Sequence, residues 1–141
     1  MQAGRGPSTI FNDRSRLMSL HQIVLELARD PDFPQGSPRH GYRFVAPITD
    51  DGHIDPEGWK EQRDRCRVVR FWGDEEEETG HLVRKPGGSW AFHYDIHGDA
   101  DSDETGYRFG THIFKPGEYL SIKEHDDEMR TFKVIMARPL S

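Results

Sequence analysis

The 141-residue sequence contains a single cysteine, Cys66, so a disulfide bond within the chain is excluded. It has no apolar run close to the roughly 18 residues that a membrane-spanning helix needs, and no recognisable signal peptide. Its 19 Lys and Arg are outnumbered by 25 Asp and Glu, which gives a formal net charge of −6. This acidic balance argues against general nucleic-acid binding, because neutralising phosphates requires clustered basic side chains. Together these absences predict a cytoplasmic protein with no nucleic-acid or membrane partner.

Sequence motifs of catalysis are also missing. There is no G-x-S-x-G turn, no glycine-rich phosphate loop and no H-E-x-x-H zinc motif. The 8 histidines and abundant carboxylates could form an acid–base pair only if the fold brought them together. The sequence therefore identifies no catalytic residue and favours a protein that is not an enzyme.

The chain has enough apolar residues for one modest core. Hydrophobic residues make up 33% of the sequence and aromatic residues 11%, a composition suited to a single domain of this length. Residues 1–17 lack sustained periodicity and carry Gly, Pro, Ser and Arg, which is typical of a flexible tail. We therefore predict an N-terminal tail over 1–17 and a single β-rich domain over 18–141.

Period-two alternation of apolar and polar residues dominates most of this domain. Short turns rich in Gly, Pro and Asp separate the alternating segments, and residues 32–41 and 98–106 have the composition of loops. This pattern predicts a mainly β (α+β) fold, a small antiparallel barrel or sandwich of about six to eight strands. The predicted strands are 42–48, 66–72, 81–84, 89–97, 107–114, 118–124 and 130–137. Residues 21–28 also fit a strand, which is favoured there, although their apolar spacing is compatible with a short helix.

One helix is predicted near residues 56–65. Asp55 stands at the N-cap position, Pro56 at the first helical position and Glu57 in the first turn, and all three favour a helix start. We expect Trp59 and the region of Cys66 to face the core.

The stretch "SWAFHYDIH" (89–97) predicts a possible metal site. A strand here places alternate apolar residues on one face and His93, Asp95 and His97 on the other, with successive members roughly 6.5–7 Å apart. Imidazole and carboxylate suit zinc, iron or manganese. Because a straight strand presents only adjacent pairs to one ion, a further ligand must come from a neighbouring strand, with His112 or His81 the candidates. A solvated strand face explains the same pattern.

The acidic stretch that follows starts like a calcium-binding loop. Asp99, Asp101 and Asp103 have the spacing of the first three ligands of an EF-hand, but Glu104 replaces the required glycine and Gly110 the final glutamate. An EF-hand is excluded, and a weak calcium or magnesium site or a plain acidic loop remain as alternatives.

A ligand or anion site is predicted around Arg70. Arg70 and Trp72 share one strand face, so the guanidinium could stack on the indole or bind a carboxylate or phosphate. Pairing of Arg70 with the acidic run at 74–78 is the other interpretation. Trp90 and Tyr94 complete the aromatic face of this candidate site.

Three segments resemble a family of short proteobacterial proteins without an assigned function: "RFWGDE" (70–75), "PGGSWAFHYD" (86–95) and "GYRFGTHIFKPGEYLSI" (106–122). The resemblance implies a bacterial cytosolic protein and transfers no catalytic residue to this chain. A narrower stretch, "FKPGEYLSI" (114–122), is similar to the strand entry of flavin-binding barrels and of SH3-like barrels, which implies only a barrel.

Three functions remain open at this point. The favoured one is a non-catalytic β-rich module that binds a partner protein or a small ligand in a cleft lined with aromatic rings. The second is a divalent-metal-binding protein or metal-dependent enzyme that uses His93, Asp95 and His97 with His112. The third is a structural subunit whose acidic loops meet a basic partner.

Overall fold

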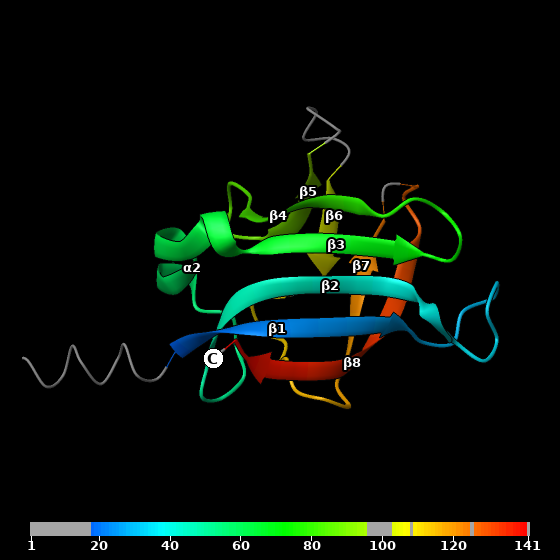
Figure 1. Ribbon diagram of the computed structural model, residues 1–141, viewed down its shortest axis with the longest axis horizontal. Helices are drawn as coiled ribbons and strands as arrows, with labels where there is room; N and C mark the ends of the chain where they lie inside the picture. The colour runs from blue at the N-terminus through cyan, green and yellow to red at the C-terminus, as the bar shows by residue number, and fades with distance from the viewer. Residues whose placement is uncertain (1–17, 96–102, 108, 125, 141) are drawn as a thin grey trace, which may run out of the picture.

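Eight antiparallel strands form a closed barrel in the computed structural model, which describes residues 18–95, 103–107, 109–124 and 126–140 (Figure 1). Each strand pairs with the next along the chain, and the last strand pairs with the first. The strands are β1 (Met18–Leu27), β2 (Ser37–Thr49), β3 (Arg67–Trp72), β4 (Glu78–Arg84), β5 (Trp90–Tyr94), β6 (Glu104–Tyr107), β7 (Tyr119–Lys123) and β8 (Met129–Pro139). The predicted mainly β fold is confirmed, and of the two predicted architectures the barrel is the one observed.

Irregularities in β1 help this sheet to close. The register of β1 shifts between Val24 and Leu25 against β8, and between Glu26 and Leu27 against β2. Bulges of this kind bend a strand and increase its twist, which a small barrel requires. Beyond Phe44, β2 pairs with β1 but no longer with β3, so Pro47 lies where a missing N–H breaks no ladder bond.

Helix α2 (Pro56–Gln62) covers one end of the barrel and continues as a 3-10 turn, η1 (Arg63–Arg65), which leads into β3 (Figure 1). The helix prediction for 56–65 is confirmed. The side chain of Asp55 accepts hydrogen bonds from the backbone N–H groups of Glu57 and Gly58, both at 3.3 Å. Trp59 packs against the core and Cys66 is fully buried, as expected.

No helix in the described part of the chain is long and apolar enough to cross a lipid bilayer.

Removing the N-cap side chain should measurably weaken this end of the barrel. Asp55→Ala is expected to lower the free energy of unfolding by about 1 kcal/mol, because two N–H groups at the helix start lose their acceptor. Urea unfolding followed by tryptophan fluorescence measures the change, and Asp55→Asn should recover most of it. A loss below about 0.3 kcal/mol for the alanine variant would show that the cap contributes little.

Side chains from alternate strand positions fill the barrel, and their polarity changes along its axis. Toward α2 the interior is apolar, with Ile48, Ile54 and Phe114 buried there. Away from α2 it contains a cluster of polar side chains that we call the polar end. Its members are Tyr42, Arg70, Tyr94, Glu104 and Glu124, all buried.

The strand predicted for 107–114 is wrong in its position. Strand β6 instead spans Glu104–Tyr107, partly inside the stretch predicted to be an acidic turn, and residues 109–114 form turns and irregular backbone. The backbone N–H of Phe109 donates to the carbonyl of Gly106 at 3.4 Å, which folds the chain back on itself. The Phe109 ring then covers Gly106 so closely that a Cβ there would lie 2.5 Å from the ring. Only glycine permits this contact.

The loop predicted for 32–41 is too long at its C-terminal end, because β2 already begins at Ser37. His40 and Gly41 pair with Trp72 and Phe71 of β3. The His40 ring also packs edge-on against Trp72, with ring centroids 4.7 Å apart. Tertiary pairing therefore overrides the Pro- and Gly-rich local composition.

Candidate functional site

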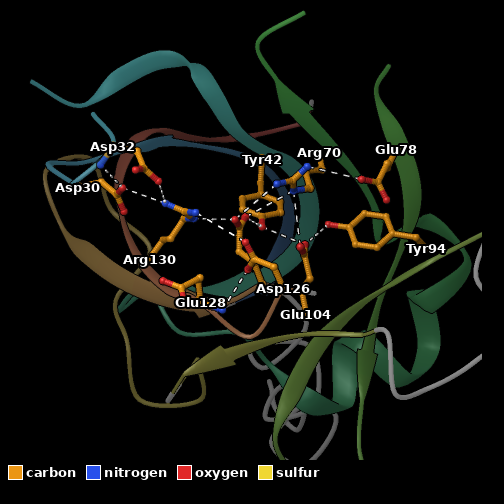
Figure 2. Close-up of polar contacts among 11 residues, drawn as sticks. Asp30, Asp32, Tyr42, Arg70, Glu78, Tyr94, Glu104, Asp126, Glu128 and Arg130 are labelled. Atoms are coloured by element: carbon orange, nitrogen blue, oxygen red, sulfur yellow. Dashed lines mark hydrogen bonds and ion pairs between the residues drawn. The ribbon is translucent and has the colours of Figure 1, made fainter. Parts of the chain in front are cut away.

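Three of the four residues predicted for an anion site converge inside the barrel. The guanidinium of Arg70 lies 4.2 Å from the centroid of the Trp72 ring, so the predicted stacking is present. Tyr94 points into the same space from β5 (Figure 2). Trp90 does not join them; it lies toward α2, where its ring meets that of Trp59 edge-on at 5.4 Å.

The guanidinium of Arg70 is occupied by carboxylates of its own chain. Its Nε lies 3.4 Å from Glu124 and 3.6 Å from Glu104, and its Nη1 lies 3.5 Å from Glu78 (Figure 2). Burial lowers the pKa of Arg70, but Tyr42, Glu124 and Glu104 outweigh that effect and the pKa is raised. Arg70 therefore remains charged and holds internal anions, including one from the acidic run as the sequence suggested.

A second arginine, Arg130 at the start of β8, lies beside this cluster. Its guanidinium lies 2.9 Å from Asp30 and 3.1 Å from Glu124. It also lies 5.7 Å from the Trp72 ring centroid, so the indole contacts both arginines. Figure 2 shows Arg130 reaching toward Asp30 and Asp32, which lie on the same side of it. Glu124 thus links two guanidiniums.

Glu104 is the most enclosed carboxyl group of the polar end, with 0% of the residue exposed. The hydroxyl of Tyr94 donates to its Oε1 at 2.6 Å, and that of Tyr42 lies 2.9 Å from the same atom. Burial raises the pKa of Glu104, and the nearby Glu124 raises it further, while the Tyr94 hydrogen bond opposes them. Burial likewise raises the pKa values of both tyrosines, which keeps their hydroxyl protons in place.

Three residues of this region, Glu104, Glu124 and Arg130, were not predicted from the sequence. For two of them, the alternation of inward- and outward-facing residues along the strand could have predicted an inward position. Leu120 and Ile122 point inward, so Glu124 continues that series, and Arg130 precedes Phe132 and Val134 in the same way. Glu104 gave no such signal because its strand was predicted in the wrong place.

Not all of the residues predicted as metal ligands belong to the part of the chain that the structure describes. His97 is not among the described residues. His93 and His81 face each other across β5 and β4, and Asp95 lies 3.5 Å from His81 Nδ1. Within the part of the chain that the structure describes, no three His, Cys, Asp or Glu side chains gather closely enough to hold a metal ion. The metal site therefore stays a prediction from sequence.

His112 is not grouped with His93, and its Nε2 is buried without a hydrogen-bond partner among the described residues. Of the predicted calcium or magnesium ligands, Asp99 and Asp101 fall outside the described residues. Asp103 is bound on both sides, by Lys85 Nζ and by His93 Nδ1, each at 2.6 Å. This pair of contacts fixes the orientation of the His93 ring.

A groove on the outer surface combines an aromatic ring with basic side chains. It lies between α2 with η1 and the outer face of β4 and β5, and its volume is about 440 Å³. We call it the Trp59 groove. It is lined by Trp59, Arg63, Asp64, His81, Leu82, Val83, Arg84 and His93. This volume is within the roughly 300–1,000 Å³ range of small-molecule sites.

Hydrogen bonds hold the walls of the Trp59 groove in place. The indole N–H of Trp59 donates to the carbonyl of Leu82 at 2.9 Å, which fixes the ring over β4. Arg67 lies 2.9 Å from His81 Nε2, and because arginine can only donate, the proton of a neutral His81 is on Nδ1. Together with the fixed His93 ring, these contacts make the groove a preformed surface.

Two arginines of the groove have no carboxylate partner among the described residues. Arg63 lies 5.7 Å from the Trp59 ring centroid, and Arg84 lies 5.3 Å from that of Trp90. The guanidinium of Arg84 donates only to the carbonyl of Gly88, at 3.4 Å. Both therefore retain donors for an anion, unlike Arg70.

A second hollow, of about 680 Å³, lies where the outer faces of β1, β7 and β8 meet. The exposed side chains of Tyr119 and Ile135 contribute its apolar surface. Charges of both signs line it, Glu26 against Arg29 and Lys133. The Trp59 groove has a similar mixture, with Asp64 beside Arg63 and Arg84, but it also contains the indole ring of Trp59.

Comparison with known proteins adds no assignment. No protein-family model matches the chain, and neither the curated proteins nor the solved structures contain a significant match.

Proposed function

We propose that the protein is a non-catalytic binding barrel that holds a small, ring-containing anion in the Trp59 groove. The observation that carries this proposal is the position of two unpaired guanidiniums, Arg63 and Arg84, beside the fixed indole of Trp59. Guanidiniums recognise carboxylates and phosphates by paired, charge-assisted hydrogen bonds. The half-buried indole of Trp59 and the side chain of Val83 suit a planar ring.

The polar end is a weaker candidate for the ligand site. Arg70 already has carboxylate partners from its own chain, so an anion would have to displace Glu124 or Glu104 from a buried position. Breaking a buried ion pair costs several kcal/mol. The Trp59 groove requires no such displacement.

Binding of phenyl phosphate tests the proposal, with phenol and inorganic phosphate as matched probes of the ring and of the anion alone. The indole N–H resonance of Trp59 is the reporter because that group is bonded inside the groove. We expect phenyl phosphate to shift it saturably and to bind at least about tenfold more tightly than either matched probe. Equal affinity for phenol and phenyl phosphate would contradict a guanidinium site.

Arg63→Ala and Arg84→Ala should each weaken phenyl phosphate binding by about tenfold or more. The reason is that a hydrogen bond to a charged group contributes about 1.5–3 kcal/mol, and about 1.4 kcal/mol is a factor of ten. Arg138→Ala is the control, because this exposed arginine lies on β8, away from the groove. Titration calorimetry measures the three affinities. An equal effect of all three substitutions would indicate general charge attraction instead of a site.

A further inference from the structure

A bulge at the start of β2 brings a serine and a histidine together. Glu26 and Leu27 are consecutive in β1, but their partners in β2 are four positions apart, at 41 and 37. In a regular strand, residues three positions apart point to opposite faces and lie roughly 10 Å from each other. The extra backbone of the bulge instead lets the side chains of Ser37 and His40 meet. Bulges of this kind are frequent beside functional sites.

The hydroxyl of Ser37 and the ring of His40 form a close hydrogen bond. Ser37 Oγ lies 2.6 Å from His40 Nδ1, and the backbone N–H of Arg39 donates to the same Oγ at 3.2 Å. No other acceptor among the described residues contacts this Oγ, so its proton is directed at Nδ1. The ring is held in place because it packs against both Phe33 and Trp72, with ring centroids 4.4 and 4.7 Å away.

The surroundings of His40 keep its ring neutral near neutral pH. Burial lowers the pKa of His40, and the positive charges of Arg39 and Arg70 lower it further. The carboxylates of Glu75 and Glu124 act in the opposite direction but are outweighed. A neutral imidazole has one nitrogen with a free lone pair, which can take a proton. A serine hydroxyl within hydrogen-bond reach of such a nitrogen is the arrangement that activates a serine nucleophile.

A second serine–histidine pair in the same chain lacks this arrangement. Ser19 Oγ lies 3.4 Å from His21 Nδ1 on the exposed side of β1. The same Nδ1 lies 2.9 Å from the backbone carbonyl of Ser19, and because a carbonyl can only accept, Nδ1 carries the proton. A protonated Nδ1 has no lone pair for the hydroxyl. Ser19 and His21 are therefore an internal reference for a pair that is not activated.

The hollow between the outer faces of β1, β7 and β8 includes Ser37 among its lining residues. The exposed side chains of Tyr119 and Ile135 give this hollow apolar surface. Its volume of about 680 Å³ is within the range of small-molecule sites. A short apolar chain therefore has room beside this serine.

We propose that Ser37 is a nucleophile that accepts a short apolar acyl group from an activated ester, with His40 as its base. His40 Nδ1 takes the hydroxyl proton while Ser37 Oγ forms a bond to the carbonyl carbon of the ester. The bond from that carbon to the leaving oxygen then breaks, and the leaving oxygen takes the proton from His40. The products are an acylated Ser37 and an alcohol.

This acylation goes beyond the binding function proposed for the Trp59 groove. It is a single transfer to the protein and requires no turnover. The hollow beside Ser37 and the Trp59 groove have no lining residue in common, so acylation and ligand binding can be measured separately.

Acylation by 4-nitrophenyl butyrate tests the proposal at about pH 7.5, where an imidazole without its second proton is available. Release of 4-nitrophenol gives the rate, and mass spectrometry of peptides locates the butyryl group. We expect the group on Ser37, formed at least about a hundredfold faster than on Ser19, because a positioned base contributes roughly 10²–10⁴-fold. Equal labelling of the two serines, or labelling of lysines alone, would overturn the proposal. This comparison is made within the wild-type chain and depends on no variant.

Substitution of each histidine tests whether His40 is the base. His40→Asn should slow acylation of Ser37 by about a hundredfold or more, whereas His21→Asn, the same change in the reference pair, should leave the rate within about twofold. Urea unfolding of both variants shows that the compared chains are folded. An unchanged rate in folded His40→Asn, or equal slowing by the two substitutions, would overturn the role of His40.

Discussion

Replacing Arg70 with methionine is expected to lower the free energy of unfolding by about 3–5 kcal/mol. The side chain of Arg70 is only 6% exposed, and its guanidinium lies 3.5 Å from Glu78 and 3.6 Å from Glu104. Methionine fills a similar volume, so the loss reports mainly carboxyl groups that remain buried without their cation. Urea unfolding at about pH 7, followed by fluorescence and far-UV circular dichroism together, measures the change.

Arg43→Met is the control for this substitution. Arg43 lies on the neighbouring strand β2, pairs with Glu77 at 3.3 Å and stacks 5.2 Å from the Phe71 ring, but its side chain is 39% exposed. Exposed ion pairs contribute about 0–1 kcal/mol, so this variant should lose no more than about 1 kcal/mol. If Arg70→Met and Arg43→Met lowered the free energy of unfolding equally, the ion pairs of the polar end would stabilise the barrel no more than an exposed ion pair does.

The double variant Arg70→Met/Glu124→Gln tests how much of the stability lost in Arg70→Met comes from the ion pair with Glu124. Because Arg70 and Glu124 contact each other, the two substitutions should not be additive. Once the carboxylate of Glu124 is gone, methionine leaves less uncompensated charge, and the double variant should lose less stability than the sum of the single variants. Additive losses would place the main partner of Arg70 elsewhere.

The sequence predicted the barrel because period-two alternation and turn composition are local properties. Residues 90–94 show how directly this works: Trp90, Phe92 and Tyr94 are buried as their alternation predicts. The helix start at Asp55 was equally local and was also confirmed. Neither feature depends on which strands become neighbours.

The polar end and the Trp59 groove depend on neighbours, and this explains why the sequence did not predict them. Glu104 and Glu124 meet only because β6 and β7 pair and both face Tyr42 of β2 across the barrel. The Trp59 groove exists because the indole N–H bonds to the carbonyl of Leu82, which is 23 residues away in sequence. Arg70 and Trp72 were predicted together because both are on one strand. The apolar–polar alternation of one strand does not indicate which side chains of other strands surround Arg70 and Trp72.

The burial of both Phe109 and Phe114 distinguishes the observed loop from the strand that alternation suggested for 107–114. In a strand these two residues, five positions apart, would point to opposite faces, so only one ring could lie in the core. In the structure both rings are 1% exposed, with their centroids 5.3 Å apart, and both pack near Phe44. The N–H of Phe114 also donates to the carbonyl of Gly52 at 2.8 Å, which ties the loop to the turn after β2.

Phe109→Ala and Phe114→Ala should therefore each lower the free energy of unfolding by about 3–5 kcal/mol, because each leaves a cavity among aromatic rings. Tyr119→Ala provides the control, since that ring is 54% exposed and its loss should cost about 1 kcal/mol or less. Urea unfolding gives all three values. A strand at 107–114 would make one phenylalanine as tolerant as Tyr119, so equal and large losses at both positions would contradict that strand and agree with a chain that folds back over Gly106.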